Sequence, residues 1–171
     1  MHSKPMAALA GLAMAASMAS ASTPIVLTFN GIDQWSGSFA ALTSGATNFS
    51  LDLTALAGSW TSINLSSAIS ANFSGASGYD VTAVTFDGNA FTPVANVSIP
   101  GVFGVDAWTY QATNIAAGPH TLVVTGNLIG GTVGFTGSVN IQAQPVPEPE
   151  SYALMLAGLA AIGLVVRRRS R

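Results

Sequence analysis

Residues 48–53 have the sequence Asn-Phe-Ser-Leu-Asp-Leu, which is the clearest indication of the fold class. Phe49, Leu51 and Leu53 alternate with the polar Ser50 and Asp52. An alternation with a period of two places the apolar side chains on one face of a β-strand. Short apolar runs of the same kind recur through the central part of the chain, separated by glycine, asparagine, serine and proline. The pattern predicts an all-β domain.

Residues 22–144 are expected to form this domain, as a single β-sandwich of the jelly-roll or immunoglobulin-like type. The other candidate strands are residues 25–29, 62–65, 69–73, 81–86, 90–94, 107–111, 120–125 and 133–141. Asp87-Gly88-Asn89 is expected to form a hairpin turn, because Asp-Gly suits backbone positions with positive φ. A calcium loop at these residues is the less favoured interpretation. Short helices at residues 40–42 or 55–58 remain open alternatives.

Charge is distributed unevenly along the 171 residues, of which 7% are charged. All five basic residues lie near the ends, and between residues 5 and 147 the only charged side chains are five aspartates: Asp33, Asp52, Asp80, Asp87 and Asp106. A nucleic-acid partner is therefore excluded, because phosphate binding needs a basic patch. The absence of cysteine excludes disulfides, thiolate metal sites and cysteine nucleophiles.

The first 21 residues have the pattern of a secretory signal peptide. Lys4 precedes an alanine- and methionine-rich run over residues 6–18, and Ala19 and Ala21 supply small residues at positions −3 and −1 of a cleavage site. The pattern predicts passage through the Sec translocon and cleavage by signal peptidase after Ala21. A membrane-anchoring or buried helix is the alternative, but the run is short for an anchor.

Residues 145–171 contain three parts in a fixed order. A proline-rich stretch is expected to be extended, because proline restricts its own backbone and that of the preceding residue. The apolar run over residues 152–166 is expected to form a transmembrane helix of roughly 22 Å, shorter than the roughly 30 Å hydrocarbon core. The stop-transfer cluster that follows is expected to remain cytoplasmic and consists of Arg167, Arg168, Arg169 and Arg171.

This order of elements resembles the PEP-CTERM sorting signal of Gram-negative bacteria. The matching residues are the motif Val146, Pro147, Glu148 and Pro149, the segment at residues 152–159 and the terminal arginines. The resemblance implies recognition by an exosortase, which cuts near the motif. The protein would be held transiently in the inner membrane and then delivered to the outer surface or extracellular matrix. A plain membrane anchor with a rigid spacer is the alternative.

Two further segments resemble the FxDxF group of PEP-CTERM proteins. Residues 116–126, Ala-Ala-Gly-Pro-His-Thr-Leu-Val-Val-Thr-Gly, and residues 135–141 are similar to two late strands of that group. At the position of the naming motif this chain has Gly31-Ile32-Asp33-Gln34-Trp35, with glycine and tryptophan in place of the two phenylalanines.

Few residues of the predicted domain could perform catalysis. His120 is its only imidazole, and it is expected to be an exposed strand residue. The domain contains no glutamate and no Gly-x-Ser-x-Gly nucleophile elbow. We therefore expect a protein that is not an enzyme and has no catalytic residue, cofactor or metal site.

Aromatic side chains are the stronger functional indication. Trp108 and Tyr110 share one strand face and could stack against sugar rings, although they could equally fill the core. The favoured function is an exosortase-sorted protein of the cell surface or matrix, associated with exopolysaccharide or biofilm. A carbohydrate-binding module with the same sorting signal is the alternative. A secreted hydrolase and an ice-binding protein are remote possibilities.

Overall fold

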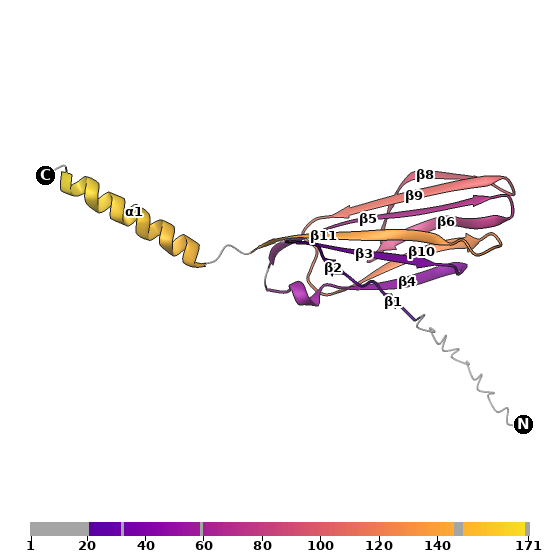
Figure 1. Cartoon of the computed structure of the whole chain (residues 1–171), viewed down its shortest axis with the longest axis horizontal. Coiled ribbons are helices and arrows are strands. Elements are labelled where there is room, and N and C mark those ends of the chain that lie inside the picture. The colour runs from indigo at the N-terminus through magenta and orange to yellow at the C-terminus, as the bar shows by residue number, and fades with distance from the viewer. Residues whose placement is uncertain (1–20, 32, 59, 146–148, 170–171) are drawn as a thin grey trace, which may run out of the picture.

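The computed structural model describes residues 21–31, 33–58, 60–145 and 149–169. These residues form eleven strands, one short 3₁₀ helix and one α-helix (Figure 1). In chain order, they are β1 (Thr23–Pro24), β2 (Thr28–Phe29), β3 (Gln34–Ala41), β4 (Gly45–Asp52), η1 (Thr54–Leu56), β5 (Trp60–Ser74), β6 (Ser77–Phe86), β7 (Asn89–Ala90), β8 (Thr92–Ile99), β9 (Phe103–Ala112), β10 (Pro119–Leu128), β11 (Phe135–Pro145) and α1 (Pro149–Arg169).

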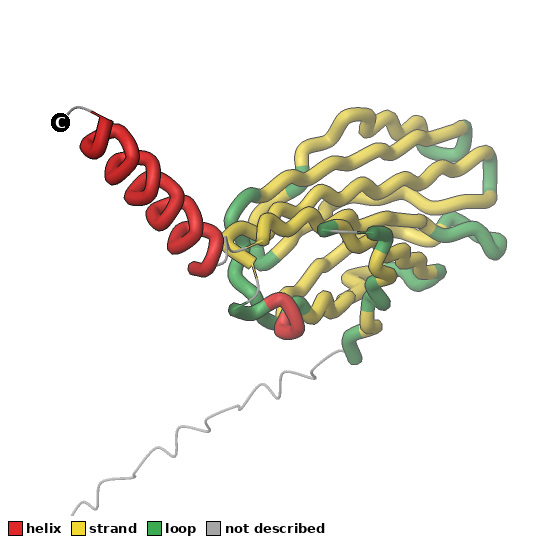
Figure 2. Tube along the Cα trace, turned by 60° about the vertical axis from the view of Figure 1, so that its left-hand side comes forward, coloured by secondary structure: helices red, strands yellow, loops and turns green. Residues whose placement is uncertain are grey.

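The strands form one curled sheet in the order β1-β4-β10-β6-β5-β11-β3-β2. In addition, β7 pairs with β6, and β9 pairs with both β5 and β8. The two halves of the sheet meet at the β5–β6 hairpin, and Figure 2 shows the strands curving round a common interior. The all-β prediction is therefore confirmed, while the jelly-roll or immunoglobulin-like sandwich type stays a prediction.

The core lies inside the curl, between β4, β6 and β10 on one side and β3, β5, β9 and β11 on the other. The alternation over residues 48–53 is confirmed, because Phe49, Leu51 and Leu53 are each only 1% exposed. Rings from both halves of the sheet meet there, with Phe49 and Phe135 in an edge-to-face contact at 6.0 Å between centroids. Burial of these apolar faces is the main favourable contribution to folding.

The strand β5 joins two predicted strands, at residues 62–65 and 69–73, into one of fifteen residues. The linking residues are the small Ser66, Ser67 and Ala68, which interrupt the apolar pattern without breaking the strand. Ser67 points inward, is 4% exposed, and donates a hydrogen bond from its hydroxyl to the Ser138 carbonyl at 2.8 Å. A buried serine with its hydroxyl paired is tolerated in a core.

Other sequence predictions are confirmed or corrected locally. Asp87 and Gly88 have φ values of 48° and 81°, as a two-residue hairpin turn requires, and they connect β6 to β7. The predicted strand at residues 25–29 is instead divided between β1 and β2. Residues 40–42 contain no helix, because β3 extends to Ala41. The alternative of a short helix at residues 55–58 is met in part, because the 3₁₀ helix η1 covers Thr54–Leu56.

The predicted C-terminal helix is present as α1, which is longer than residues 152–166 at both ends. Its identification as a transmembrane helix is not supported, because no helix in the described ranges has the length and apolar character needed to cross a membrane. Of the proposed signal peptide, residues 1–20 lie outside the described residues, and only Ala21 is seen, as an exposed residue before β1.

Candidate functional site

The predicted sorting segment joins the last strand to α1. Pro145 is the final residue of β11 and pairs with Trp60, and Pro149 begins α1. Proline is favoured at the first position of a helix because its missing N–H would have no partner there. Val146, Pro147 and Glu148 lie outside the described residues, as does Arg171.

The last turn of α1 contains Arg167, Arg168 and Arg169. Positive side chains at a helix C-terminus interact favourably with the partial negative charge of the unpaired carbonyls. The arginines of the predicted stop-transfer signal therefore also stabilise the last turn of α1.

His120 is buried, which corrects the expectation of an exposed residue. It is 9% exposed and stacks against Phe86 at 5.3 Å between ring centroids. Its Nδ1 lies 2.6 Å from Asp87 Oδ2 and its Nε2 lies 2.8 Å from the Ala116 carbonyl oxygen. Because both neighbours are acceptors, the pair of hydrogen bonds is complete only when both ring nitrogens carry a proton. Both ring nitrogens therefore face acceptor atoms of the chain itself.

Asp87 has a structural role in the same cluster. Its Oδ1 accepts a hydrogen bond from the Thr121 N–H at 2.8 Å, while Oδ2 contacts His120. The carboxylate thereby fixes the β6–β7 turn against β10. Among the residues that the structure describes, no three histidine, aspartate or glutamate side chains form a group that could hold a metal ion.

Trp108 and Tyr110 both point toward the interior. Trp108 is 7% exposed, and its indole Nε1 has no hydrogen-bond partner among the described residues. Tyr110 is half-buried and stacks against Phe91, with 5.0 Å between the ring centroids. Trp108 belongs to the buried core and Tyr110 packs against that core, so core filling is the interpretation that the structure favours for this pair.

Asp106 lies two residues before Trp108 on the same inward face of β9. It is 1% exposed; its Oδ2 accepts a hydrogen bond from the Val81 N–H at 2.9 Å, and its Oδ1 has no partner among the described residues. Burial raises the pKa of this carboxyl group, the Val81 N–H opposes the increase, and the charge of Asp80 adds to it. Asp106 therefore connects β9 to β6 and is not available on the surface.

The outer face of β3, β11, β5 and β9 has a different character. None of its outward positions is charged: most carry hydroxyl or amide groups, a few are alanine, and the first part of β9 adds the exposed Phe103 and Val105. The register aligns them in transverse rows, one of which consists of Gln111, Ser66, Asn140 and Ser36 on four neighbouring strands. The adjacent row consists of Asn64, Gln142 and Gln34.

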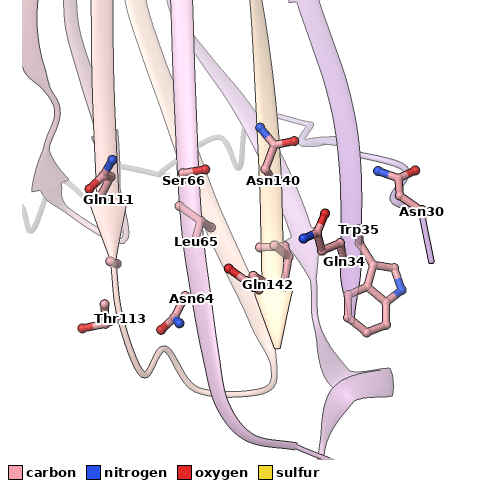
Figure 3. A pocket seen from close by; sticks show the side chains of 12 residues that line it. Asn30, Gln34, Trp35, Asn64, Leu65, Ser66, Gln111, Thr113, Asn140 and Gln142 are labelled. Carbon is pink, nitrogen blue, oxygen red and sulfur yellow. The ribbon is translucent and has the colours of Figure 1, made fainter. Parts of the chain in front are cut away.

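These two rows line a shallow groove of about 390 Å³, which Figure 3 shows from close by. The strand backbone forms its floor, while the amides of Gln34, Asn140 and Gln142 extend over it; the Trp35 ring points to the other side of β3. Asn30 closes one end and donates a hydrogen bond to Ser36 Oγ at 2.7 Å. The groove can exchange hydrogen bonds with a polar, uncharged ligand.

Sequence reasoning missed the residues of this groove. The period-two alternation over residues 34–40 and 136–144 indicates which polar side chains share a strand face. It does not indicate that β11 lies between β3 and β5, and that pairing is what brings the amides together.

Comparison with known proteins gives one match. No curated protein and no solved structure is detectably similar to the chain. Residues 145–169 match the family model of the PEP-CTERM protein-sorting motif. The match supports a protein with a PEP-CTERM sorting signal, which implies export, transient membrane anchoring and exosortase-dependent sorting to the cell surface.

Proposed function

We propose that the chain is a non-catalytic protein of the outer surface or extracellular matrix, retained with the exopolysaccharide of the bacterium that exports it. The observation that carries the proposal is the sorting motif at residues 145–169. The signal peptide proposed for residues 1–21 would supply the export step through the Sec translocon.

The position of the motif is compatible with cleavage. The strand β11 ends at Pro145 and α1 begins at Pro149. A cut between them would therefore remove α1 and leave every described strand in the sheet. The buried positions of β11 all precede this point, because Ala143 is its last buried residue.

The non-catalytic part of the proposal rests on His120. Both of its nitrogens contact acceptors within the chain, and it is almost fully buried. A general base needs a nitrogen within reach of the substrate proton. This geometry favours a role for His120 in holding the β6–β7 turn.

Deletion of residues 147–149 tests the sorting proposal. The expected result is accumulation of the uncut protein in the inner membrane, and replacement of the same three residues by alanine should have the same effect at unchanged chain length. The matched control, Gln144→Ala, lies just before the motif and should be sorted normally. Surface delivery that is unchanged by both alterations of the motif would contradict the proposal.

Mass spectrometry of the mature protein tests both termini. We expect an N-terminus at Ser22 and a C-terminus near residues 145–149. A mature surface protein that still ends at Arg171 would instead favour a plain membrane anchor.

A carbohydrate-binding module on the same sorting signal is the second candidate function. The observation that favours it is the amide-lined groove on the outer face. Selective capture of the intact protein by matrix polysaccharide would support it, whereas a purely structural matrix protein should show no selective ligand.

A further inference from the structure

We infer that the groove between β3, β11, β5 and β9 binds a neutral polysaccharide chain through its side-chain amides. The inference rests on the proposed function only in assuming that the domain meets polysaccharide outside the cell. It replaces aromatic stacking at Trp108 and Tyr110 with hydrogen bonding on the opposite face of the same part of the sheet.

Charge determines the class of polysaccharide. The outward positions of the four strands carry no charged side chain, and residues 22–144 contain five aspartates but no lysine or arginine. An anionic polymer would be repelled by this net negative domain. A cationic polymer would find no carboxylate within the groove itself, because none of the lining residues is acidic. A neutral chain meets neither obstacle.

Hydrogen-bonding capacity points to hydroxyl groups. Side-chain amides both donate and accept, as sugar hydroxyls do. Within the described part of the chain, the side chains of Gln34, Gln111, Asn140 and Gln142 make no hydrogen bond to another residue, so their amides face only solvent. Asn64 accepts from the Asn114 N–H at 3.3 Å, which leaves the amide N–H groups of Asn64 for a ligand.

The shape of the face favours a polymer over a single sugar. The two amide rows lie about 6.8 Å apart along the strands, and neighbouring side chains within a row lie about 4.8 Å apart. A further row, formed by Thr109, Ala68, Ser138 and Ser38, continues the uncharged surface beyond the groove. A shallow groove without an aromatic platform binds each sugar weakly, so many repeated contacts along one chain are needed for useful affinity.

Affinity electrophoresis of the full chain in a mild detergent tests the inference. The polymers are dextran and hydroxyethyl cellulose as neutral probes, alginate as the anionic probe and chitosan oligomers as the cationic probe. The test variant is Asn140→Ala/Gln142→Ala. The matched control is Gln144→Ala, which removes an exposed amide from the same face of β11 but lies outside the groove.

We expect at least one neutral polymer to retard the protein and its control equally, and the double variant to bind about tenfold more weakly. Thermal unfolding should be unchanged in both variants, because all three side chains are exposed. The monosaccharide of the retarding polymer should compete poorly.

Three outcomes would overturn the inference: retardation by neither neutral polymer, retardation by alginate or chitosan that equals the neutral probes, or the same loss in the Gln144→Ala control. These outcomes are independent of the sorting proposal, which is read from the location of the protein in cells. Normal sorting without polysaccharide retardation would reject the groove alone, and retardation of a protein that is never sorted would reject the sorting proposal alone.

Discussion

Replacement of Asp106 by asparagine is expected to stabilise the protein at neutral pH. The carboxyl group is 1% exposed, and only one of its oxygens has a partner, the Val81 N–H at 2.9 Å. No lysine or arginine lies in residues 22–144 to neutralise it. A buried ionised group with an unpaired oxygen is costly, so folding favours the protonated acid.

The sign of the pH dependence follows from the raised pKa of Asp106, whose main cause is burial. A group whose pKa is higher in the folded than in the unfolded protein stabilises the fold fully when the pH lies below its pKa in the unfolded protein. That stabilisation is lost as the pH rises through its pKa in the folded protein. The free energy of unfolding of the wild type should therefore decrease, on account of this residue, between pH 4 and pH 7.

The asparagine amide keeps an acceptor for the Val81 N–H and removes the buried charge, so Asp106→Asn should be more stable than the wild type at pH 7 and lose this advantage at pH 4. In contrast, Asp106→Leu also removes the acceptor and leaves the Val81 N–H unpaired, at a cost of about 1–3 kcal/mol.

Chemical unfolding of the full chain at pH 4 and pH 7, followed by tryptophan fluorescence, measures these differences. Comparing each variant with the wild type isolates Asp106, because the pKa of the exposed Asp52, lowered by its hydrogen bonds to the Thr54 side chain and backbone, affects all proteins alike. An Asp106→Asn variant that is no more stable than the wild type at pH 7 would contradict this prediction.

Three further substitutions test the packing described above. His120→Phe should retain the ring stacking but lose about 1–3 kcal/mol, because Asp87 Oδ2 and the Ala116 carbonyl oxygen lose their donor; unchanged urea unfolding would contradict this role. Gly126→Ala should destabilise the protein by about 1–3 kcal/mol, because an added Cβ would lie 2.4 Å from a backbone carbonyl oxygen of the neighbouring strand β6. An unchanged melting temperature would show that β10 and β6 can move apart at this position. Trp108→Ala should cost about 3–5 kcal/mol of stability. If Trp108→Ala instead abolished polysaccharide binding at an unchanged melting temperature, the hypothesis that Trp108 and Tyr110 stack against sugar rings would be favoured again.

The local features of the β domain were predictable where neighbouring residues alone determine them. Asp87-Gly88 forms the expected turn because few other residue pairs adopt two successive positive φ values. The break expected between residues 65 and 69 was wrong, because Ser67 is small and its hydroxyl is paired across the sheet. A hydrogen bond to a residue 71 positions away leaves no local signal.

The burial of His120 was not predictable in the same way. Its partner Asp87 lies 33 residues earlier in the chain, and only the pairing of β10 with β6 brings the two together. For Trp108, alternation correctly placed the ring on the same face as Tyr110 but did not show which face of β9 points inward. That choice depends on the position of β6 beneath it.

Composition, short-range periodicity and linear order are sufficient to predict the β class of the central region, the apolar helix after the last strand and the sorting motif. Which polar side chains are buried, and which meet on the outer face, depends on the tertiary structure. Gln34, Asn64, Gln111 and Gln142 share one groove because β3, β11, β5 and β9 pair in that order and register. Strand pairing depends on contacts between residues far apart in the chain, and these contacts form only when the whole sheet closes around its core.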